Sequence, residues 1–214
     1  MTVAPDGSPI ELYLRLPSLG EAERVHDAID PGAEILELGC GVGRVTHDLL
    51  RLGHPVTAVD ESAEMLAHVR GATAVRASIE RLDLARRFPC VLLMSQLVND
   101  DEHRAEFLRA CARHLAPDGI VVIERHPPDW RPEAGVRRTI GDVEVELEDV
   151  VVEPPFLAAT VRYESDGSIW RQPFRAHLLD DAELDAALRD AGLRFARTLD
   201  DGGTWVEARL YSGA

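Results

Sequence analysis

The segment that most restricts the fold of this chain is residues 34–44, Glu-Ile-Leu-Glu-Leu-Gly-Cys-Gly-Val-Gly-Arg. An apolar run from Ala33 to Leu38 predicts a buried strand, and helical spacing of apolar residues resumes from Val42 to Leu52. A turn without Cβ atoms lets a ligand approach the backbone, and the free N–H groups that begin a helix favour an anionic group. The turn between this strand and this helix contains Gly39, Gly41 and Gly43.

The rest of the first 125 residues repeats this alternation of strand and helix. Apolar runs predict further strands at 55–59, 73–75, 90–95 and 120–124, and helical spacing predicts helices at 21–29, 62–69 and 100–115. Asp100 or Asp101 is the predicted N-cap of the last of these helices. Strands separated by helices form parallel βαβ units, so we predict an α/β fold with a parallel sheet.

The apolar period changes to two after residue 125. Val143, Val145 and Leu147 alternate with glutamates, the segment 157–163 repeats the pattern, and residues 168–175 predict a third strand. We therefore expect residues 136–178 to form an antiparallel flap with one exposed, acidic face. It should pack as a layer separate from the parallel sheet.

The C-terminal part of the chain should complete the sheet. A helix is predicted at 181–191, and strands at 193–199 and 204–210 are joined by Asp-Asp-Gly-Gly as a terminal antiparallel hairpin. We predict three regions. These are an N-terminal cap segment and helix at 1–32, a cofactor-binding core at 33–135 and 179–214, and a substrate flap at 136–178.

An acid at the end of the second predicted strand complements the glycine turn. Asp60 follows Gly39 by 21 residues, a position from which a carboxylate can accept both hydroxyls of a ribose. Dinucleotide-binding proteins prefer G-x-G-x-x-G, but Arg44 stands where the third glycine belongs, and Glu37 has no role in that motif. The motif E-x-G-x-G-x-G is instead the first motif of class I S-adenosylmethionine-dependent methyltransferases. The chain resembles that family over about residues 33–125.

This resemblance implies a Rossmann-like methyltransferase sheet and S-adenosylmethionine as cofactor, with S-adenosylhomocysteine as product. It implies that the glycines pass under the methionine part, that Glu37 meets the ammonium or steadies the turn, and that Asp60 holds the ribose. An acid common at the third motif is replaced by Ser78, which is either an adenine contact or a plain loop residue. The full set of implied cofactor contacts is Glu37, Gly39, Cys40, Gly41, Gly43, Asp60, Glu61, Met65, Ser78, Ile79, Ser95 and Gln96.

Some of these residues have structural alternatives. Met65, on the inner face of a short helix, is a position more often in the core than at a cofactor, although one side chain can serve both. Asp60 could cap the helix that follows it, a role compatible with ribose binding.

The acceptor should bind in the crevice outside the carboxyl ends of the strands. His126 is the candidate general base because it follows a buried strand and an unperturbed histidine titrates near neutrality. The alternative is a loop histidine bonded to backbone. Tyr13 is a second catalytic candidate, in a segment expected to fold over the cofactor. Further residues expected to face the crevice are Gln96, Asn99, Arg125 and Trp130, with Arg15, Arg171 and His177 as additional candidates.

The composition limits the kinds of partner that the chain is expected to bind. The net charge is −15, with arginine as the only basic residue besides histidine, which argues against a general nucleic-acid binder and against docking on anionic membranes. No apolar run approaches the roughly 18 residues that span a bilayer. The 3 cysteines lack metal-ligand spacing, so we expect no metal site and reduced thiols in a cytoplasmic protein.

The sequence therefore predicts an enzyme, a methyltransferase that acts on nitrogen or oxygen of a small molecule, as a monomer or homodimer. The alternative keeps the fold and the cofactor without methyl transfer, as in a cyclase-type enzyme or a non-catalytic partner subunit.

Overall fold

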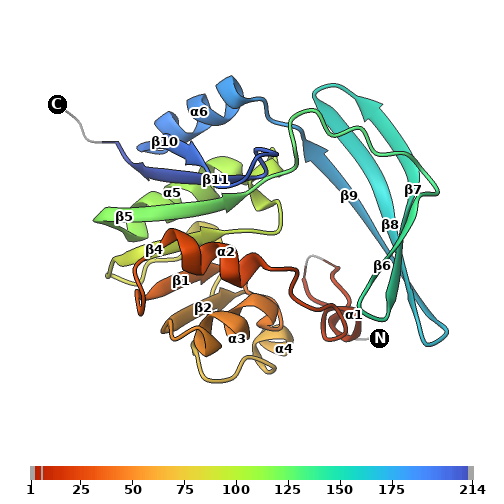
Figure 1. Ribbon diagram of the computed structural model, residues 1–214, viewed down its shortest axis with the longest axis horizontal. Coiled ribbons are helices and arrows are strands. Elements are labelled where there is room, and N and C mark those ends of the chain that lie inside the picture. Colours follow the sequence, from red (N-terminus) through yellow and green to blue (C-terminus); the bar gives the residue numbers. More distant parts are fainter. Residues whose placement is uncertain (1–2, 6, 212–214) are drawn as a thin grey trace.

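Two separate β-sheets organise the chain in the computed structural model, which describes residues 3–5 and 7–211 (Figure 1). The larger sheet has seven strands in the order β10-β11-β5-β4-β1-β2-β3. Strands β1 to β5 run parallel to one another, whereas β11 is antiparallel to both β5 and β10. The predicted parallel sheet with a C-terminal antiparallel hairpin is therefore confirmed. The strands are β1 (Ile35–Leu38), β2 (Val56–Asp60), β3 (Thr73–Arg76), β4 (Phe88–Leu93), β5 (Leu115–Glu124), β10 (Leu193–Thr198) and β11 (Trp205–Leu210).

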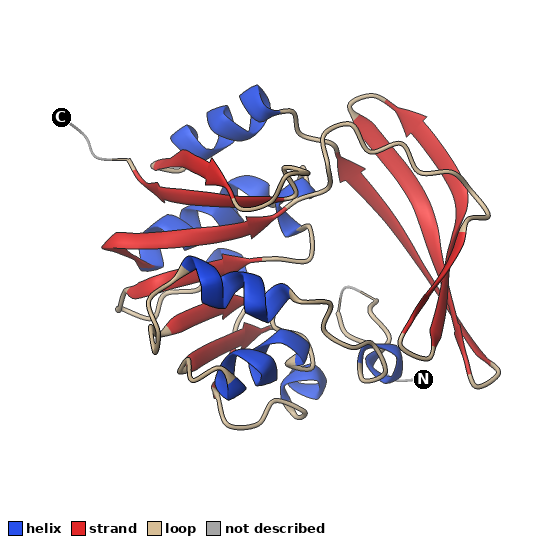
Figure 2. Ribbon diagram, in the orientation of Figure 1, coloured by secondary structure: helices blue, strands red, loops and turns tan. Residues whose placement is uncertain are grey.

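Helices cover both faces of this sheet, because its central strands are apolar on both sides (Figure 2). Leu36 and Leu38 pack toward α5 and α6, whereas Ile35 packs toward α2 and α3. The helices are α1 (Ile10–Tyr13), α2 (Glu21–Ala28), α3 (Arg44–Arg51), α4 (Ala63–Leu66), α5 (Arg104–His114) and α6 (Asp181–Asp190), with short 3₁₀ turns η1 (Ile79–Arg81) and η2 (Leu97–Asn99). Within the described residues, no helix is both long and apolar enough to cross a membrane.

The flap is a second, four-stranded antiparallel sheet that stands beside the carboxyl edge of the first (Figure 1). It is a separate layer, as predicted, but its first strand, β6, was not predicted. Only four residues long and mostly exposed, β6 offers too short a pattern to recognise. The strands are β6 (Arg137–Ile140), β7 (Val143–Glu153), β8 (Phe156–Ser165) and β9 (Ser168–His177).

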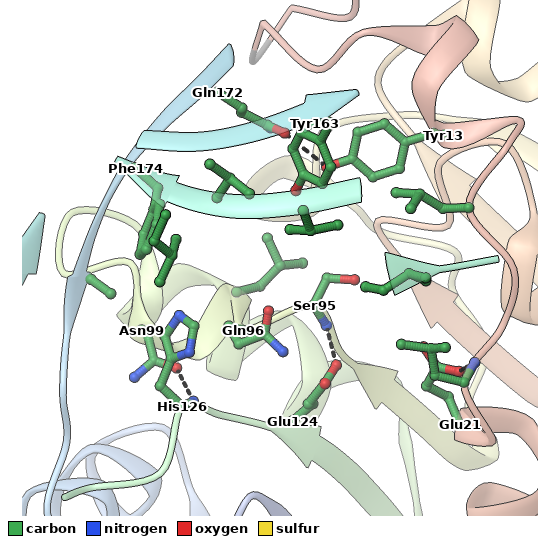
Figure 3. A pocket seen from close by; sticks show the side chains of 18 of the residues that line it. Tyr13, Glu21, Ser95, Gln96, Asn99, Glu124, His126, Tyr163, Gln172 and Phe174 are labelled. Atoms are coloured by element: carbon green, nitrogen blue, oxygen red, sulfur yellow. Dashed lines mark hydrogen bonds between the residues drawn. The ribbon is translucent and has the colours of Figure 1, made fainter. Parts of the chain in front are cut away.

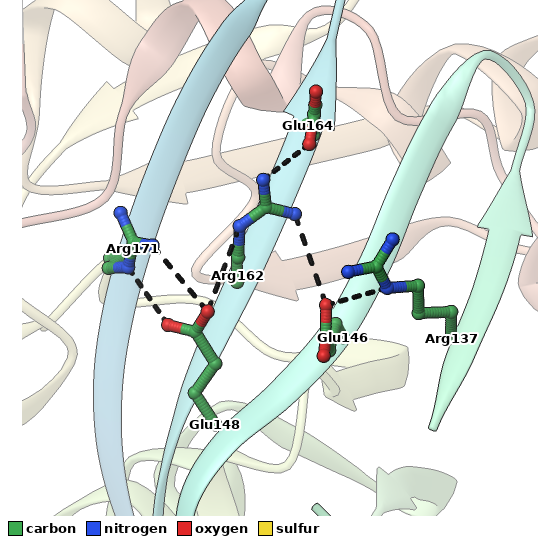
Figure 4. Close-up of polar contacts among 6 residues, drawn as sticks. All are labelled: Arg137, Glu146, Glu148, Arg162, Glu164 and Arg171. Atoms are coloured by element: carbon green, nitrogen blue, oxygen red, sulfur yellow. Dashed lines mark hydrogen bonds and ion pairs between the residues drawn. The ribbon is translucent and has the colours of Figure 1, made fainter. Parts of the chain in front are cut away.

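The outer face of the flap carries both signs of charge rather than the acidic surface that was predicted (Figure 4). Arg162 on β8 forms ion pairs with Glu146 and Glu148 on β7. Arg137 and Arg171, on the neighbouring strands, pair with the same two glutamates at 2.9 and 2.8 Å. Arg137 lies on β6, which was not predicted, and the sequence does not show which residues of β8 and β9 face the glutamates of β7. Cross-strand pairing therefore neutralises the glutamates of β7.

The N-terminal segment connects the two sheets. Leu12 on α1 is fully buried against Val143, Val145 and Trp170 of the flap. Arg15 donates hydrogen bonds to Ser165 and Asp166 in the β8–β9 hairpin, at 3.2 and 2.8 Å. Leu12 and Arg15 thus attach the N-terminal segment to the flap.

Three predicted boundaries differ from the structure by more than two residues. The helix predicted at 62–69 is only α4, because Val69 already turns back into the core, and Ser62 is its N-cap. Helix α5 begins at Arg104, since Asp100 accepts from the N–H groups of Glu102 and His103 in a preceding turn. Strand β5 begins at residue 115 rather than 120, because the pairing of Leu115 with Phe88 resumes beyond a register shift.

Candidate active site

The glycine turn between β1 and α3 is fixed to the neighbouring strand. The N–H groups of Gly39 and Cys40 both donate to the carbonyl of Val59 on β2 at 2.9 Å. Gly39 has φ +74°, a left-handed conformation that favours glycine, and a Cβ there would lie 3.0 Å from Leu97 Cδ1. At Gly41, with φ +56°, a Cβ would meet no atom within 4 Å. The backbone of Gly41 therefore borders open space, as a surface that accepts a ligand must.

Asp60 ends β2 directly beside this turn. Its Oδ2 accepts from the N–H of Gly41 and its Oδ1 from the N–H of Ser62, both at 2.9 Å. The expected alternative, that Asp60 is the cap of the following helix, is wrong, because the Ser62 hydroxyl accepts from the N–H of Met65 and supplies that cap. Each carboxylate oxygen keeps a second lone-pair direction, so the two bonds leave Asp60 able to accept from a diol.

Glu37 lies beneath the turn with 2% of its surface exposed. Its Oε2 accepts from the hydroxyl of Thr46 on α3 at 2.5 Å. Burial raises the pKa of Glu37 to about 7, against the opposing effects of that hydrogen bond and of the Arg44 charge. A buried carboxyl group of this kind is stabilised in its ionised form by a nearby cation. An ammonium group lying on the turn would supply one.

The residues expected around the adenine lie on both sides of the turn. Met65 is buried with Ile10, Val42 and Ala4, so it is a core residue whether or not it also contacts a ligand. Ile79 is nearly buried, and its Cδ1 would lie 3.9 Å from a Cβ on Gly39.

The remaining residues of this predicted group have defined positions. Ser78 precedes η1 in extended conformation and makes no capping hydrogen bond there. Glu61 is exposed, and its carbonyl accepts from Arg76. Cys40 is buried, its Sγ donates to the carbonyl of Gly41, and burial raises its thiol pKa.

A cavity of about 430 Å³ separates the carboxyl edge of the large sheet from the flap (Figure 3). The glycines and Asp60 are not part of its lining, but Arg44, which follows Gly43, and Leu97, which packs on Gly39, both are. The cavity thus adjoins the glycine turn. Residues of the sequence prediction that line it are Tyr13, Ser95, Gln96, Asn99, His126 and Trp130.

A strained turn after β4 forms one side of this cavity. Ser95 and Gln96 have φ +54° and +57°, left-handed conformations that cost non-glycine residues about 1–3 kcal/mol each. Glu124, at the end of β5, accepts from the N–H of Ser95 at 2.8 Å. Burial raises the pKa of Glu124. The carboxylate therefore holds the turn while lining the cavity.

His126 forms an aromatic wall with Trp130 and Phe174. Its ring is stacked on Trp130 with centroids 4.4 Å apart, and Phe174 of β9 lies 6.0 Å away. Its backbone N–H donates to Oδ1 of Asn99, whose Nδ2 donates to the carbonyl of His177. The expectation of titration near neutrality is wrong, because burial lowers the pKa of His126 to about 4. The imidazole is therefore neutral at pH 7 and able to accept a proton.

Tyr13 reaches the cavity from the N-terminal segment. Its hydroxyl donates to Oε1 of Gln172 on β9 at 3.3 Å (Figure 3). Tyr163 lies beside it, and burial together with the neighbouring Tyr13 raises the Tyr163 pKa. Three polar side chains thus gather on the flap side of the cavity.

Four of the expected crevice residues point elsewhere. Arg125 is fully buried and binds the carbonyls of Gly203 and Leu179 and the carboxylate of Asp181, because its side chain alternates to the opposite side of β5 from Glu124. The other three lie outside the cavity lining: Arg15 pairs with Asp166, Arg171 with Glu148 and His177 with Glu183.

Several cavity residues were missed by the sequence analysis. Glu124 could have been found, since it ends a predicted strand by the same rule that selected Gln96 and His126. Tyr163 is one of the apolar positions of its strand, so its side chain lies on the opposite face of the flap from that of Arg162. The ion pair of Glu21 with Arg44 has no sequence signal, because it joins two separate helices. Burial would raise the pKa of Glu21, but Arg44 lowers it overall.

Known proteins that are similar to this chain in sequence or structure are methyltransferases. Residues 35–119 match the family model described as a methyltransferase domain. The ubiquinone biosynthesis O-methyltransferase of Caulobacter sp. (strain K31) is 31% identical over 127 residues, covering 52% of this chain and 48% of that protein. The protein of the same description from Bradyrhizobium sp. (strain ORS 278) is 30% identical over 135 residues, covering 58% and 53%. The chain thus spans about half the length of these curated relatives.

Solved structures match almost the whole chain. The sugar N-methyltransferase KedS8 from Streptoalloteichus sp ATCC 53650 has a TM-score of 0.73 at 22% identity, covering 99% of this chain and 97% of its own. The CcbJ methyltransferase from Streptomyces caelestis has the same score and identity, covering 98% and 93%. CalS10 of Micromonospora echinaspora, an amino pentose methyltransferase with SAM bound, has a TM-score of 0.69 at 20% identity, covering 89% and 88%. Residues 35–119 are therefore similar to methyltransferase domains, and the chain has the fold of these solved methyltransferases.

Proposed function

We propose that this protein is an S-adenosylmethionine-dependent methyltransferase that acts on a nitrogen or oxygen atom of a small molecule. One observation carries the proposal. The glycine turn, with Asp60 bonded to Gly41, adjoins a cavity of about 430 Å³ that lies under the flap. A cofactor site and an acceptor site of small-molecule size therefore meet at one edge of the sheet.

The residues present fit the cofactor. Gly41 borders open space, Asp60 keeps lone pairs for a diol, and Glu37 is a buried carboxyl group suited to an ammonium. We assign ribose contact to Asp60, ammonium stabilisation to Glu37, and backbone contact to the glycine turn. S-adenosylmethionine, when bound, supplies an electrophilic methyl group on a sulfonium.

The chain itself aligns the acceptor and excludes water, which is the main requirement for an in-line displacement with a good leaving group. The flap side of the cavity carries Tyr13, Tyr163 and Gln172, and the aromatic wall carries His126. Neutral His126 can accept a proton from the acceptor, and Tyr13 can form a hydrogen bond with the acceptor. We propose both as the residues that touch the acceptor.

We extend the proposal to the setting of the enzyme. The net charge of −15 and the small cavity favour a small-molecule acceptor over nucleic acid. We propose action in the cytoplasm as a monomer or homodimer, without a metal. The proposed regions are a cap segment at 1–32, a core at 33–135 and 179–214, and a flap at 136–178 that covers the acceptor.

Calorimetry tests the cofactor assignment. S-adenosylhomocysteine should bind, and NAD should not bind appreciably, because Arg44 occupies the place of the third dinucleotide-site glycine. NAD binding more tightly than S-adenosylhomocysteine would falsify the proposed function. Release of S-adenosylhomocysteine from S-adenosylmethionine with a panel of amines and phenols then tests transfer itself.

A further inference from the structure

Most charged side chains that line the cavity are already neutralised by a partner of opposite charge. Glu21 pairs with Arg44. Asp100 pairs with His103, which lies outside the lining, and Arg175 of the flap pairs with Asp101.

Two lining charges have no ion-pair partner among residues 3–5 and 7–211, namely Glu124 and Arg138. Arg138 is exposed on the short strand β6 at the flap. Glu124 is half-buried at the end of β5, between the turn after β4 and the aromatic wall. The uncompensated charge on the sheet side of the cavity is therefore negative.

The hydrogen bond of Glu124 leaves it able to bind a further donor. One oxygen accepts from the N–H of Ser95. An ionised carboxylate offers about four lone-pair sites, so this bond does not exhaust it. Burial raises the pKa of Glu124 and the neighbouring Glu21 adds to this effect, which the more distant Arg44 guanidinium opposes without forming an ion pair. A cationic ligand would stabilise the ionised form.

The rest of the same cavity favours a ligand with an apolar or planar body. His126, Trp130 and Phe174 form a stacked wall, with Trp130 and Phe174 centroids 6.4 Å apart. Val145, Leu147 and other apolar side chains of the flap face them. Aromatic faces attract both flat ring systems and cations.

We propose that Glu124 receives the amino group of the acceptor, and that the substrates are primary or secondary amines with an apolar or planar body. This inference rests on the proposed function and selects nitrogen over oxygen within it.

The chemistry of transfer supports this selection. The bound ammonium first gives one proton to His126, the proposed base. The lone pair of the neutral amine then forms the new N–C bond while the S–C bond breaks, and the electron pair of that bond stays on sulfur. Positive charge therefore appears on the nitrogen during the reaction, beside the negative charge of Glu124. The methylated ammonium leaves with this charge, and His126 returns its proton to water. A hydroxyl group would have to lose its proton before it became an effective nucleophile, and a carboxylate next to it would disfavour the resulting anion.

Glu124→Gln removes the charge and keeps an oxygen that accepts from Ser95, so the turn after β4 should persist. The probes are benzylamine, which is cationic at neutral pH, and benzyl alcohol, its uncharged counterpart. Binding is measured by calorimetry in the presence of S-adenosylhomocysteine. The matched control is Glu106→Gln, which removes the same charge from the exposed surface of α5, where Glu106 pairs only with Arg109.

Wild-type protein and the Glu106 variant should bind benzylamine at least about tenfold more tightly than benzyl alcohol, the scale of a hydrogen bond to a charged group. Glu124→Gln should lose this preference while its affinity for benzyl alcohol and S-adenosylhomocysteine stays unchanged. Equal affinity of the wild type for both probes overturns the inference without need of any variant, as does an unchanged preference in Glu124→Gln. Failure of the wild type to bind S-adenosylhomocysteine would instead count against the proposed function. The preference for benzylamine, measured without S-adenosylhomocysteine, still decides the role of Glu124.

Discussion

Asp60 shows how one carboxylate shapes both the loop and the ligand surface. It accepts from the N–H groups of Gly41 and Ser62, so it fixes the glycine turn against the start of α4 before any ligand arrives. Asp60→Ala should therefore weaken S-adenosylhomocysteine binding by about 1–3 kcal/mol, the scale of hydrogen bonds to a charged group. Calorimetry measures this loss. Asp60→Asn keeps one accepting oxygen, so its affinity should lie between those of the wild type and the alanine variant. Unchanged affinity in the alanine variant would show that the ribose lies elsewhere.

His126 should make stability depend on pH in the acidic range. Burial lowers its pKa from 6.5 to about 4, so between these values the unfolded chain binds the proton and the folded chain does not. Stability should therefore fall as the pH falls from 6.5 toward 4. His126→Phe keeps a ring against Trp130 and removes the titration, so its Tm should fall less between pH 7 and 4.5 than that of the wild type. Parallel losses of Tm in both proteins would contradict the assignment.

The same residue tests catalysis. General-base catalysis contributes about 10²–10⁴-fold, and His126→Phe should lower turnover by that order if the imidazole takes the proton of the acceptor. Because its pKa is about 4, the wild-type rate should show no histidine limb near pH 6.5. S-adenosylhomocysteine affinity serves as the control and should stay nearly constant. A limb near pH 6.5 that disappears in the variant would show that burial does not lower the pKa as described.

At the scale of secondary-structure elements, the flap is a sheet of its own. It contributes Tyr163, Gln172 and Phe174 to the cavity but no part of the glycine turn. Replacing residues 140–175 by a short Gly/Ser linker should therefore spare S-adenosylhomocysteine binding and abolish turnover. Calorimetry and a transfer assay measure the two effects separately. Full activity of the shortened protein would refute a covering role. Arg15→Ala, which removes the contacts of Arg15 with Ser165 and Asp166 but keeps the flap, provides a folded comparison.

At the scale of the whole molecule, the sequence predicted the order of strands and helices, the separate flap and the glycine turn. These depend on local periodicity and on a turn whose backbone only glycine tolerates easily, so a short stretch of sequence contains the signal. The cavity walls were predicted only in part. The side on which Arg125 points and the pairing of Glu21 with Arg44 depend on how distant elements pack, and no local pattern encodes that. The pKa of His126 likewise depends on burial by Trp130 and Phe174, which only the fold brings together.

The burial of Leu12 among Val143, Val145 and Trp170 affects how such a protein can be recombined. In the linear sequence the flap looks like a contiguous cassette that could be exchanged between relatives. In three dimensions it is a split module, whose missing piece lies more than a hundred residues upstream, before α2. A chimera that takes residues 136–178 from a relative but keeps its own N-terminal segment would pack Leu12 against flap residues from another protein. Acceptor preference should therefore be inherited through both segments together.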